Sequence, residues 1–355
     1  MNILLLSPLP PPEGGIATWT KKYKKYCEEH NISLSIVNIG LIGKRLKKIN
    51  DGRNYFDEIK RTVRILRDLK VQLKSCNPDI VHMNSSCSRF GIIRDALCVK
   101  IIKGFKIPMV FHCRCNIGDQ VQTNVSRHMF KYIARNVNAV LVLNTTSYNY
   151  AVRLAKNKTI KVPNFIESEY LNSSYCIREN MKCVIFVGHV QRTKGCYEIL
   201  SAARELPDLE FVLMGSIAKE MENEDIPANV KMLGGKSHNE VKEYLENADI
   251  FLFPSYTEGF SNALVEAMAT GLPIVTTDVG ANFDMIEGYG GMIVPVGDYQ
   301  TIVDAINEMR PCSIRQSMSE WNREKVQKEY LIDSVMCKLL SIYERACSNR
   351  DKIAN

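Results

Sequence analysis

Residues 249–280 read DIFLFPSYTEGFSNALVEAMATGLPIVTTDVG, and this stretch decides the fold. It begins with the apolar run 250–253, which is short and rich in β-forming residues, as is typical of a buried strand in a parallel sheet. A polar turn follows, and Ser261 offers a capping oxygen to a helix expected over 263–270. A Gly-Leu-Pro sequence ends that helix before a second apolar strand begins. The stretch therefore predicts a strand–helix–strand unit of an open α/β sheet.

The turn between this strand and helix is a candidate ligand site. Ligands of open α/β sheets bind beyond the carboxyl ends of the strands, which is where this turn lies. A helix start favours an anion such as a diphosphate, because its first N–H groups lack partners within the helix and its dipole is positive there. We therefore expect Gly259, Phe260, Ser261 and Asn262 to contact an anionic or sugar-bearing ligand.

Two carboxylates flank the turn, Glu258 and Glu266. A glycosidase pair requires carboxylates about 5 to 9.5 Å apart, whereas eight helical residues already rise ~12 Å along the axis. The two glutamates are therefore expected to hold different parts of one extended ligand. The alternative is a capped helix that carries two solvated glutamates, since short motifs also occur by chance.

The sequence EGFSNALVEA of residues 258–267, preceded by Phe-Pro-Ser and followed by Gly-Leu-Pro, resembles the E-x7-E signature of retaining glycosyltransferases of family 4, of the polysaccharide-biosynthesis type. The resemblance implies the GT-B fold, an α/β architecture in which two Rossmann-like, doubly wound parallel-sheet domains face a central cleft. It also implies that a sugar is transferred from a nucleotide-diphosphate sugar to an acceptor.

The remainder of the chain favours two domains. Strand and helix signals alternate from residue 2 onward, as expected for doubly wound sheets. We expect an N-terminal, acceptor-binding domain over 1–165 and a C-terminal, donor-binding domain over 166–330, with the polar segment 166–180 as linker. A C-terminal helix in 331–355 is expected to return to the first domain, by the same resemblance.

Composition indicates an ordinary globular protein. The chain has 355 residues, of which 45% are hydrophobic and 24% are charged. No apolar run approaches the ~18 residues of a membrane helix, and the first residues lack the features of a signal peptide. The twelve cysteines are scattered, as expected for reduced core residues. These observations predict a cytoplasmic protein.

The family resemblance extends into the N-terminal half. Gly14 and Gly15 follow the first strand and are similar to the glycine loop that lies over the donor diphosphate. His112, at the end of another strand, is similar to the histidine beside the reacting sugar, which implies a catalytic role. Without the resemblance, a lone histidine at a strand end is more often structural.

The donor site is expected in the C-terminal half. Lys194 matches the family's phosphate-binding lysine, but His189 stands where the family usually has arginine. Arg192 is close enough in sequence to supply that charge, so either side chain can be the one that meets the phosphate. The resemblance implies that Glu258 binds the transferred sugar as a catalytic residue, without acting as a covalent nucleophile, and that Glu266 binds the ribose.

Cofactor and partner expectations follow from what the sequence offers. No Asp-x-Asp lies at a strand end, so we predict no essential metal and no cofactor besides the nucleotide sugar, which is a co-substrate. Residues 1–165 carry 28 Lys and Arg against 10 Asp and Glu, a balance of +18, whereas the rest carries −11. No nucleic-acid-binding module is present. The basic half therefore suggests an anionic membrane surface, contacted through the Trp19, Tyr23 and Tyr26 stripe and the basic segment 44–48.

The function predicted from the sequence is retaining transfer of a sugar to a hydroxyl of a lipid-linked or oligosaccharide acceptor in surface polysaccharide biosynthesis. The enzyme would act in the cytoplasm, peripherally on the inner face of the membrane. The alternative from a different class is a catalytically silent, nucleotide-sugar-binding partner of another transferase. An alternative for the aromatic stripe is that it packs its helix against the sheet.

Overall fold

The chain forms two compact α/β units. The computed structural model describes residues 1–12, 14–41, 55–171 and 176–354. One unit comprises 1–163 together with 336–355, and the other comprises 164–335. The division falls two residues before the domain boundary that the sequence suggested. Each unit has its own sheet and its own hydrophobic core.

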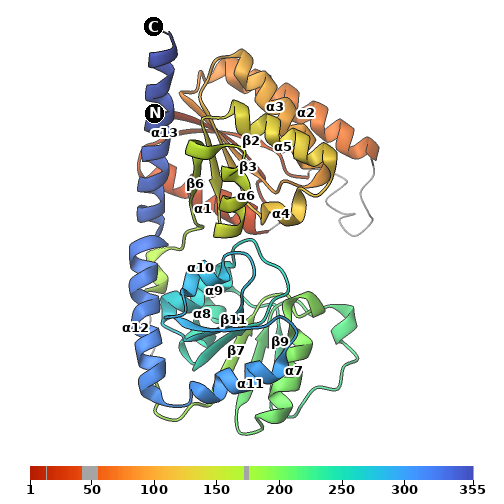
Figure 1. Cartoon of the computed structure of the whole chain (residues 1–355), viewed down its shortest axis with the longest axis vertical. Coiled ribbons are helices and arrows are strands. Elements are labelled where there is room, and N and C mark those ends of the chain that lie inside the picture. Colours follow the sequence, from red (N-terminus) through yellow and green to blue (C-terminus); the bar gives the residue numbers. More distant parts are fainter. Residues whose placement is uncertain (13, 42–54, 172–175, 355) are drawn as a thin grey trace. The chain divides into compact units, whose positions relative to one another are not determined.

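The first unit is built on a parallel sheet of six strands within the described residues, in the order β2-β1-β3-β4-β5-β6. The strands are β1 (Asn2–Ser7), β2 (Ser33–Asn38), β3 (Ile80–Ser85), β4 (Met109–Cys113), β5 (Ala139–Val142) and β6 (Thr159–Lys161). The helices are α1 (Gly15–Glu29), α2 (Tyr55–Ser75), α3 (Arg89–Gly104), α4 (Ile117–Gln120), α5 (Asn124–Asn136) and α6 (Thr145–Val152), with a short 3₁₀ turn η2 (Lys156–Lys158). Figure 1 shows α2, α3 and α5 side by side in this unit.

The second unit contains another six-stranded parallel sheet, in the order β12-β11-β10-β7-β8-β9 over the residues described. Its strands are β7 (Cys183–Val187), β8 (Glu210–Met214), β9 (Val230–Gly234), β10 (Ile250–Phe253), β11 (Ile274–Thr277) and β12 (Gly291–Val294). Its helices are α7 (Cys196–Glu205), α8 (His238–Glu246), α9 (Asn262–Thr270), α10 (Asn282–Ile286), α11 (Tyr299–Glu308) and α12 (Cys312–Glu329), with the 3₁₀ turns η3 (Ser168–Tyr170), η4 (Arg192–Lys194) and η5 (Lys219–Met221).

The chain order reverses direction once in each sheet. In the first sheet the reversal lies between β1 and β3, and in the second it lies between β7 and β10. Connections leave such a pair of strands toward opposite faces, which opens a crevice at their carboxyl ends. Each unit therefore has one position that topology alone marks as a ligand site.

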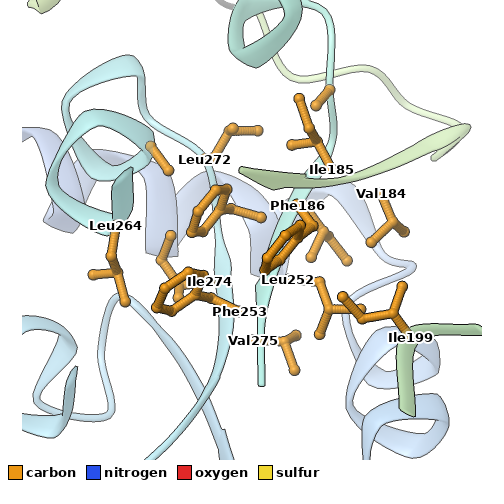
Figure 2. Packing of buried hydrophobic residues seen from close by; sticks show 14 of the residues in the cluster. Val184, Ile185, Phe186, Ile199, Leu252, Phe253, Leu264, Leu272, Ile274 and Val275 are labelled. Carbon is orange, nitrogen blue, oxygen red and sulfur yellow. The ribbon is translucent and has the colours of Figure 1, made fainter. Parts of the chain in front are cut away.

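The core of the second unit explains why the quoted stretch folds as it does. Phe251 and Phe253 of β10 are buried at 0% and 3% exposure, and Leu264 of α9 is also fully buried. Figure 2 shows Phe253 and Leu264 close to Ile274 and Val275 of β11. The helix and both strands of the predicted unit thus share one apolar core, and the strand–helix–strand prediction is confirmed.

The last helix joins the two units along the chain. Helix α13 (Ile332–Ala354) begins in the second unit, and its residues from 336 onward belong to the first. At the start of the segment predicted as linker, the Ile166 N–H donates to the Tyr330 carbonyl at 2.9 Å, and Ile332 donates back to Ile166 at 3.0 Å. These two bonds tie residue 166 to the end of α12.

The aromatic stripe of α1 does not lie on the surface. Trp19, Tyr23 and Tyr26 are 3%, 0% and 9% exposed, and Tyr23 hydrogen-bonds Tyr343 of α13 at 3.3 Å between the hydroxyl oxygens. The alternative interpretation, in which these rings pack the helix, is therefore correct, and the stripe offers no membrane contact. The basic segment 44–48 lies outside the described residues.

Candidate functional site

The candidate site of the second unit lies where β7 and β10 end. The turn after β7 leads through His189 into η4, which carries Arg192 and Lys194, and the turn after β10 carries Glu258. These strands are hydrogen-bonded neighbours on either side of the chain reversal. The sequence-predicted donor residues of this unit, far apart along the chain, therefore follow two adjacent strands.

Lys194 and Glu258 form the centre of this site. The Lys194 ammonium makes an ion pair with Oε1 of Glu258, and the Ser255 hydroxyl donates to the same oxygen at 2.9 Å. Their side chains are only 21% and 11% exposed. Burial weakens screening by water, so this pair is stronger than a surface ion pair. The structure thus brings together the phosphate-binding lysine and the sugar-binding glutamate expected from the sequence.

Backbone contacts explain how two distant turns bring these side chains together. The Tyr256 N–H donates to the Thr193 carbonyl at 3.0 Å, which joins the β10 turn to η4. Gly195 follows with φ +75°, and a Cβ at this position would overlap the Pro254 carbonyl oxygen. Only glycine combines this backbone conformation with so close an approach. Gly195 therefore allows Lys194 to reach Glu258.

The start of α9 lies directly after Glu258. Ser261 is the N-cap, and its hydroxyl accepts from the Leu264 N–H at 3.2 Å. The N–H groups of Asn262 and Ala263, the first two residues of α9, have no acceptor within the helix. The Asn262 side chain accepts from Asn164 at 2.8 Å, and the Phe260 ring packs edge-on against Tyr330 with centroids 5.9 Å apart. Because these side chains already have partners, the backbone around Ser261 is the part of the turn most available to bind a ligand.

Glu266 lies in the second turn of α9 and is half-buried. Burial chiefly raises the pKa of Tyr170, and Glu266 contributes to this rise, which places the two groups near each other. Glu258 precedes the helix, so the two glutamates stand at different positions along it, as the sequence predicted. Their roles toward a ligand stay predictions.

His189 and Arg192 point to different partners. The His189 ring Nδ1 hydrogen-bonds the Ser216 hydroxyl, whereas the Arg192 guanidinium lies over the Tyr197 ring, 5.8 Å from its centroid. The Arg192 N–H donates to Glu220 at 2.8 Å. Arg192 also lowers the pKa of Tyr256, although hydrogen bonding to Glu198 and burial raise it more. Arg192 stands in η4, which the Tyr256 N–H joins to the turn after β10.

In the first unit, His112 lies in a buried polar cluster at the end of β4. Its ring stacks on His82 with centroids 5.4 Å apart, and His82 Nδ1 hydrogen-bonds the Tyr343 hydroxyl. Burial, followed by the charge of Arg114, holds the pKa of His112 well below its ordinary value. The same causes lower the pKa of His82 to about 3. Both rings are therefore neutral at pH 7.

Arg114 is the residue that the sequence analysis missed. It is 9% exposed, its Nη1 lies 3.2 Å from Nε2 of His112, and its guanidinium covers the Trp19 ring at 4.4 Å. No carboxylate pairs with it among the described residues. Burial lowers its pKa to about 9. A signal was present, since an arginine two residues beyond a strand-end histidine lies at the ligand-binding edge of a sheet.

Gly14 and Gly15 open α1. Gly14 is the N-cap, and both residues are exposed with open space around the position of a side chain. Their expected contact with a donor diphosphate stays a prediction. Within the described ranges, no three His, Cys, Asp or Glu side chains are grouped as metal ligands would be. No helix in that part of the chain is long and apolar enough to cross a membrane.

Comparison with known proteins gives matches to glycosyltransferases. Residues 171–325 match the family described as glycosyl transferases group 1. A capsular polysaccharide biosynthesis glycosyltransferase of Staphylococcus aureus is 23% identical, over 90% of this chain and 91% of its own. A 2-deoxystreptamine N-acetyl-D-glucosaminyltransferase of Niallia circulans is 26% identical, with coverage of 76% and 77%. These matches indicate a glycosyltransferase.

Solved structures confirm the fold. A sucrose-phosphate synthase of Thermosynechococcus elongatus aligns with TM-score 0.77 at 16% identity, over 98% of this chain and 99% of its own. The Anabaena protein HepE in complex with UDP-glucose aligns with TM-score 0.66 at 15% identity, over 99% and 100%. The predicted GT-B architecture of two Rossmann-like α/β domains is therefore correct.

Proposed function

We propose that this protein is a retaining glycosyltransferase of the E-x7-E type, which moves a sugar from a nucleotide-diphosphate sugar to an acceptor hydroxyl. The observation that carries this proposal is the Lys194–Glu258 pair, held beside the start of α9 where the second sheet reverses direction. A cation, a carboxylate and free helix N–H groups together suit a ligand that has both phosphates and hydroxyls.

The phosphate end of the donor is assigned to Lys194, Arg192 and the α9 start. When the sugar–phosphate bond breaks, negative charge builds on the leaving diphosphate, and positive groups fixed nearby stabilise it most at that moment. The His189 ring is already hydrogen-bonded to Ser216, whereas the planar guanidinium of Arg192 has several N–H donors that suit phosphate oxygens, so we assign the second cation to Arg192. The complex of HepE with UDP-glucose supports a nucleotide-sugar donor.

The sugar end is assigned to Glu258, and the ribose to Glu266. A half-buried carboxylate accepts two or more hydroxyl hydrogen bonds, which orients the sugar relative to the departing phosphate. Ser255 and Lys194 already hold one Glu258 oxygen, so the carboxylate has a fixed direction before the donor arrives. Retention would follow from departure of the diphosphate and entry of the acceptor on one face, without a covalent intermediate.

The first unit is assigned to the acceptor, with His112 as the group beside the reacting sugar. A neutral imidazole can accept a hydrogen bond from a sugar hydroxyl through one nitrogen and donate with the other. Burial, and then the positive charge of Arg114, lower the pKa of His112 and keep the ring neutral. Gly14 and Gly15 leave open backbone at the α1 start, where the donor diphosphate is expected.

The acceptor is proposed to be a lipid-linked glycan of surface polysaccharide biosynthesis, met at the inner face of the membrane. The capsular polysaccharide relative supports this setting. Because the aromatic stripe of α1 is buried, we assign the membrane contact to helix α2 instead. Its exposed face carries Tyr55, Phe56, Ile59 and Val63, which are 60 to 74% exposed, beside Lys60, Arg67 and Lys70. Apolar and basic residues on one exposed face suit an anionic lipid surface.

A screen of nucleotide-diphosphate sugars tests the proposal. The true donor should release its nucleoside diphosphate, and proton NMR of the product should show the anomeric configuration of the donor. Because the proposal includes no essential metal, EDTA should leave the rate unchanged. Binding of a nucleotide sugar without any release, with or without candidate acceptors, would instead support the catalytically silent partner. Inversion of the configuration would contradict the retaining mechanism.

A further inference from the structure

A small polar pocket in the first unit is not used by the site described above. Its volume is about 110 Å³, which is room for several water-sized groups. Pro8, Ile39 and Ser86, which follow β1, β2 and β3, line it, so the pocket lies at the carboxyl edge of the sheet, beside its chain reversal. Topology thus marks it as a ligand position.

The charges around the pocket are already balanced. Arg61 lies 3.3 Å from Oε2 of Glu58, and Arg94 donates two hydrogen bonds to Asp95 at 2.7 and 2.9 Å. Glu58, Arg61 and Arg94 are the charged residues of the lining, within the part of the chain that the structure describes. A phosphate or carboxylate would therefore meet no excess positive charge here, in contrast to Arg114.

The pocket nevertheless offers unused hydrogen-bonding capacity. Asn84 is 1% exposed, and its Nδ2 donates to the Ser7 hydroxyl at 3.0 Å, while its Oδ1 accepts from no described group. A buried amide oxygen without a donor is costly, and a ligand hydroxyl would satisfy it. The hydroxyls of Ser86 and Ser88 line the same space.

An aromatic ring completes the lining. Phe90 is half-buried in the pocket wall, and Tyr55 packs edge-on against it at 5.3 Å between centroids. An amide and two hydroxyls that both donate and accept, next to an aromatic ring, suit a sugar, which has hydroxyls at its edge and apolar C–H groups on its face. An anion would need a net positive lining, and an apolar chain would leave Asn84 without a donor.

We propose that this pocket binds a neutral sugar residue of the acceptor, with Asn84 accepting from a sugar hydroxyl and Phe90 packing against the ring. The inference rests on the proposed function in that it assigns the sugar to the acceptor. It makes the pocket a determinant of acceptor specificity, separate from the donor groups Lys194 and Glu258 of the second unit.

Gly91 offers a way to fill the pocket without damaging the fold. It lines the pocket in the first turn of α3, and a Cβ there would lie 2.8 Å from the Ser88 hydroxyl. The Ser88 hydroxyl must rotate away from the new methyl group, and alanine is the better helix former, so Gly91→Ala should fold normally. Gly104→Ala is a matched control, because it makes the same change at the other end of α3, where a Cβ meets open space.

The test is ligand-observed saturation-transfer NMR on the full chain. The probes are methyl glucoside, galactoside, mannoside and N-acetylglucosaminide, with methyl glucuronide and inorganic phosphate as anionic comparators. We expect at least one neutral glycoside to bind, Gly91→Ala to weaken it about tenfold or more, and Gly104→Ala to bind as the wild type does. A melting temperature for Gly91→Ala at or above the wild-type value shows that folding is intact.

Several results would overturn the inference. These are no binding of any neutral glycoside, equal binding by Gly91→Ala and wild type, or tighter binding of the anionic probes. Loss of glycoside binding in Glu258→Gln would also overturn it, by locating the sugar in the second unit. Donor-dependent release of nucleoside diphosphate by the wild type is measured separately, so its absence counts against the proposed function and not against the pocket.

Discussion

At the scale of single residues, the proposed function gives the Lys194–Glu258 pair two successive tasks. Without donor, Glu258 neutralises the ammonium of Lys194 in a half-buried place. Under the proposed function, a donor diphosphate would give the lysine a stronger partner and would free Glu258 for sugar hydroxyls while Ser255 keeps the carboxylate in position. Before that, the pair avoids the cost of an isolated buried charge.

Replacement of this carboxylate should separate turnover from binding. In Glu258→Gln, the loss of a charged acceptor for the sugar should lower kcat about 100-fold or more. The KM for the donor should not rise, because Lys194 no longer has a competing carboxylate. Release of nucleoside diphosphate measures both quantities, and Glu243→Gln, at an exposed position of α8, is the control. A kcat within tenfold of the wild type would contradict the assignment.

The two buried histidines predict a specific loss of stability in acid. The pKa of His82 is about 3 in the folded protein and near 6.5 when unfolded, so the stability from its neutral form is full above pH 6.5 and is lost as the pH falls toward 3. Between pH 6.5 and 5.0 this amounts to about 2 kcal/mol for one such group. Urea unfolding at several pH values measures it.

The variant that tests this prediction is His82→Gln. Its free energy of unfolding should depend less on pH over that range than the free energy of unfolding of the wild type. His238→Gln removes an exposed histidine and should keep the wild-type dependence. If the free energies of unfolding of the wild type and His82→Gln fall in parallel as the pH is lowered, His82 is not buried in its neutral form.

At the scale of elements, Arg315 shows how a helix can be attached by one side chain. It is fully buried in α12, and its guanidinium donates to the carbonyls of Met309, Arg178 and Glu179 at 2.8 to 3.0 Å. Asp249 lies 3.8 Å away as its counter-charge. One arginine thus joins the start of α12 to the segments before β7 and β10.

Removal of this side chain should destabilise the second unit strongly. Arg315→Met leaves the buried carbonyls of Met309, Arg178 and Glu179 without their charged donor, which costs about 1–3 kcal/mol for each buried group left unsatisfied, while Asp249 keeps its pair with Arg178. Gln316→Met, at the next and exposed position, should change the free energy of unfolding little. Guanidinium-induced unfolding followed by circular dichroism gives both values. A loss below about 1 kcal/mol for Arg315→Met would show that the helix is held by other contacts.

The exposed face of α2 gives a prediction about lipid. Ile59→Ser with Val63→Ser removes two apolar groups that are 60% and 61% exposed, so the fold should persist. Flotation of the protein with anionic liposomes should fall severalfold, and high salt should weaken the binding of the wild type as well. Val125→Ser, at an exposed apolar position on α5, is the control. Flotation that responds to neither the double substitution nor salt would remove the membrane from the account.

Helices and strands that bury a full apolar face could be predicted from the sequence. Short edge strands could not, because they carry too few apolar residues to form a pattern. The run at β10 and the helix α9 have their expected positions to within a residue. Two edge strands, β6 and β12, carry little sequence signal, because Thr159–Lys161 has three residues and Gly291–Val294 begins with a glycine that depresses strand propensity. Each is recognisable only through pairing with its neighbour strand.

At the scale of the whole molecule, both sheets place their chain reversal at a cluster of polar side chains. Lys194 and Glu258 could be predicted as neighbours, because the turns that carry them match a family pattern. Arg114 had only its place two residues beyond a strand-end histidine as a signal. The pocket at Asn84 had none, since its significance lies in burial and a missing partner, which only three-dimensional packing reveals. Sequence thus predicted the residues that carry motifs and missed those defined by their surroundings.

Hydrogen–deuterium exchange with and without a turnover-competent nucleotide sugar tests the central claim most directly. We expect slower exchange on donor binding at the amides of Lys194 and Gly195 and at those of Asn262 and Ala263, which have no acceptor within α9. Exchange at α12, distant in sequence from these turns, should not change. If the donor protects other segments and leaves both turns unaltered, the diphosphate is not bound between β7 and β10, and the account is contradicted.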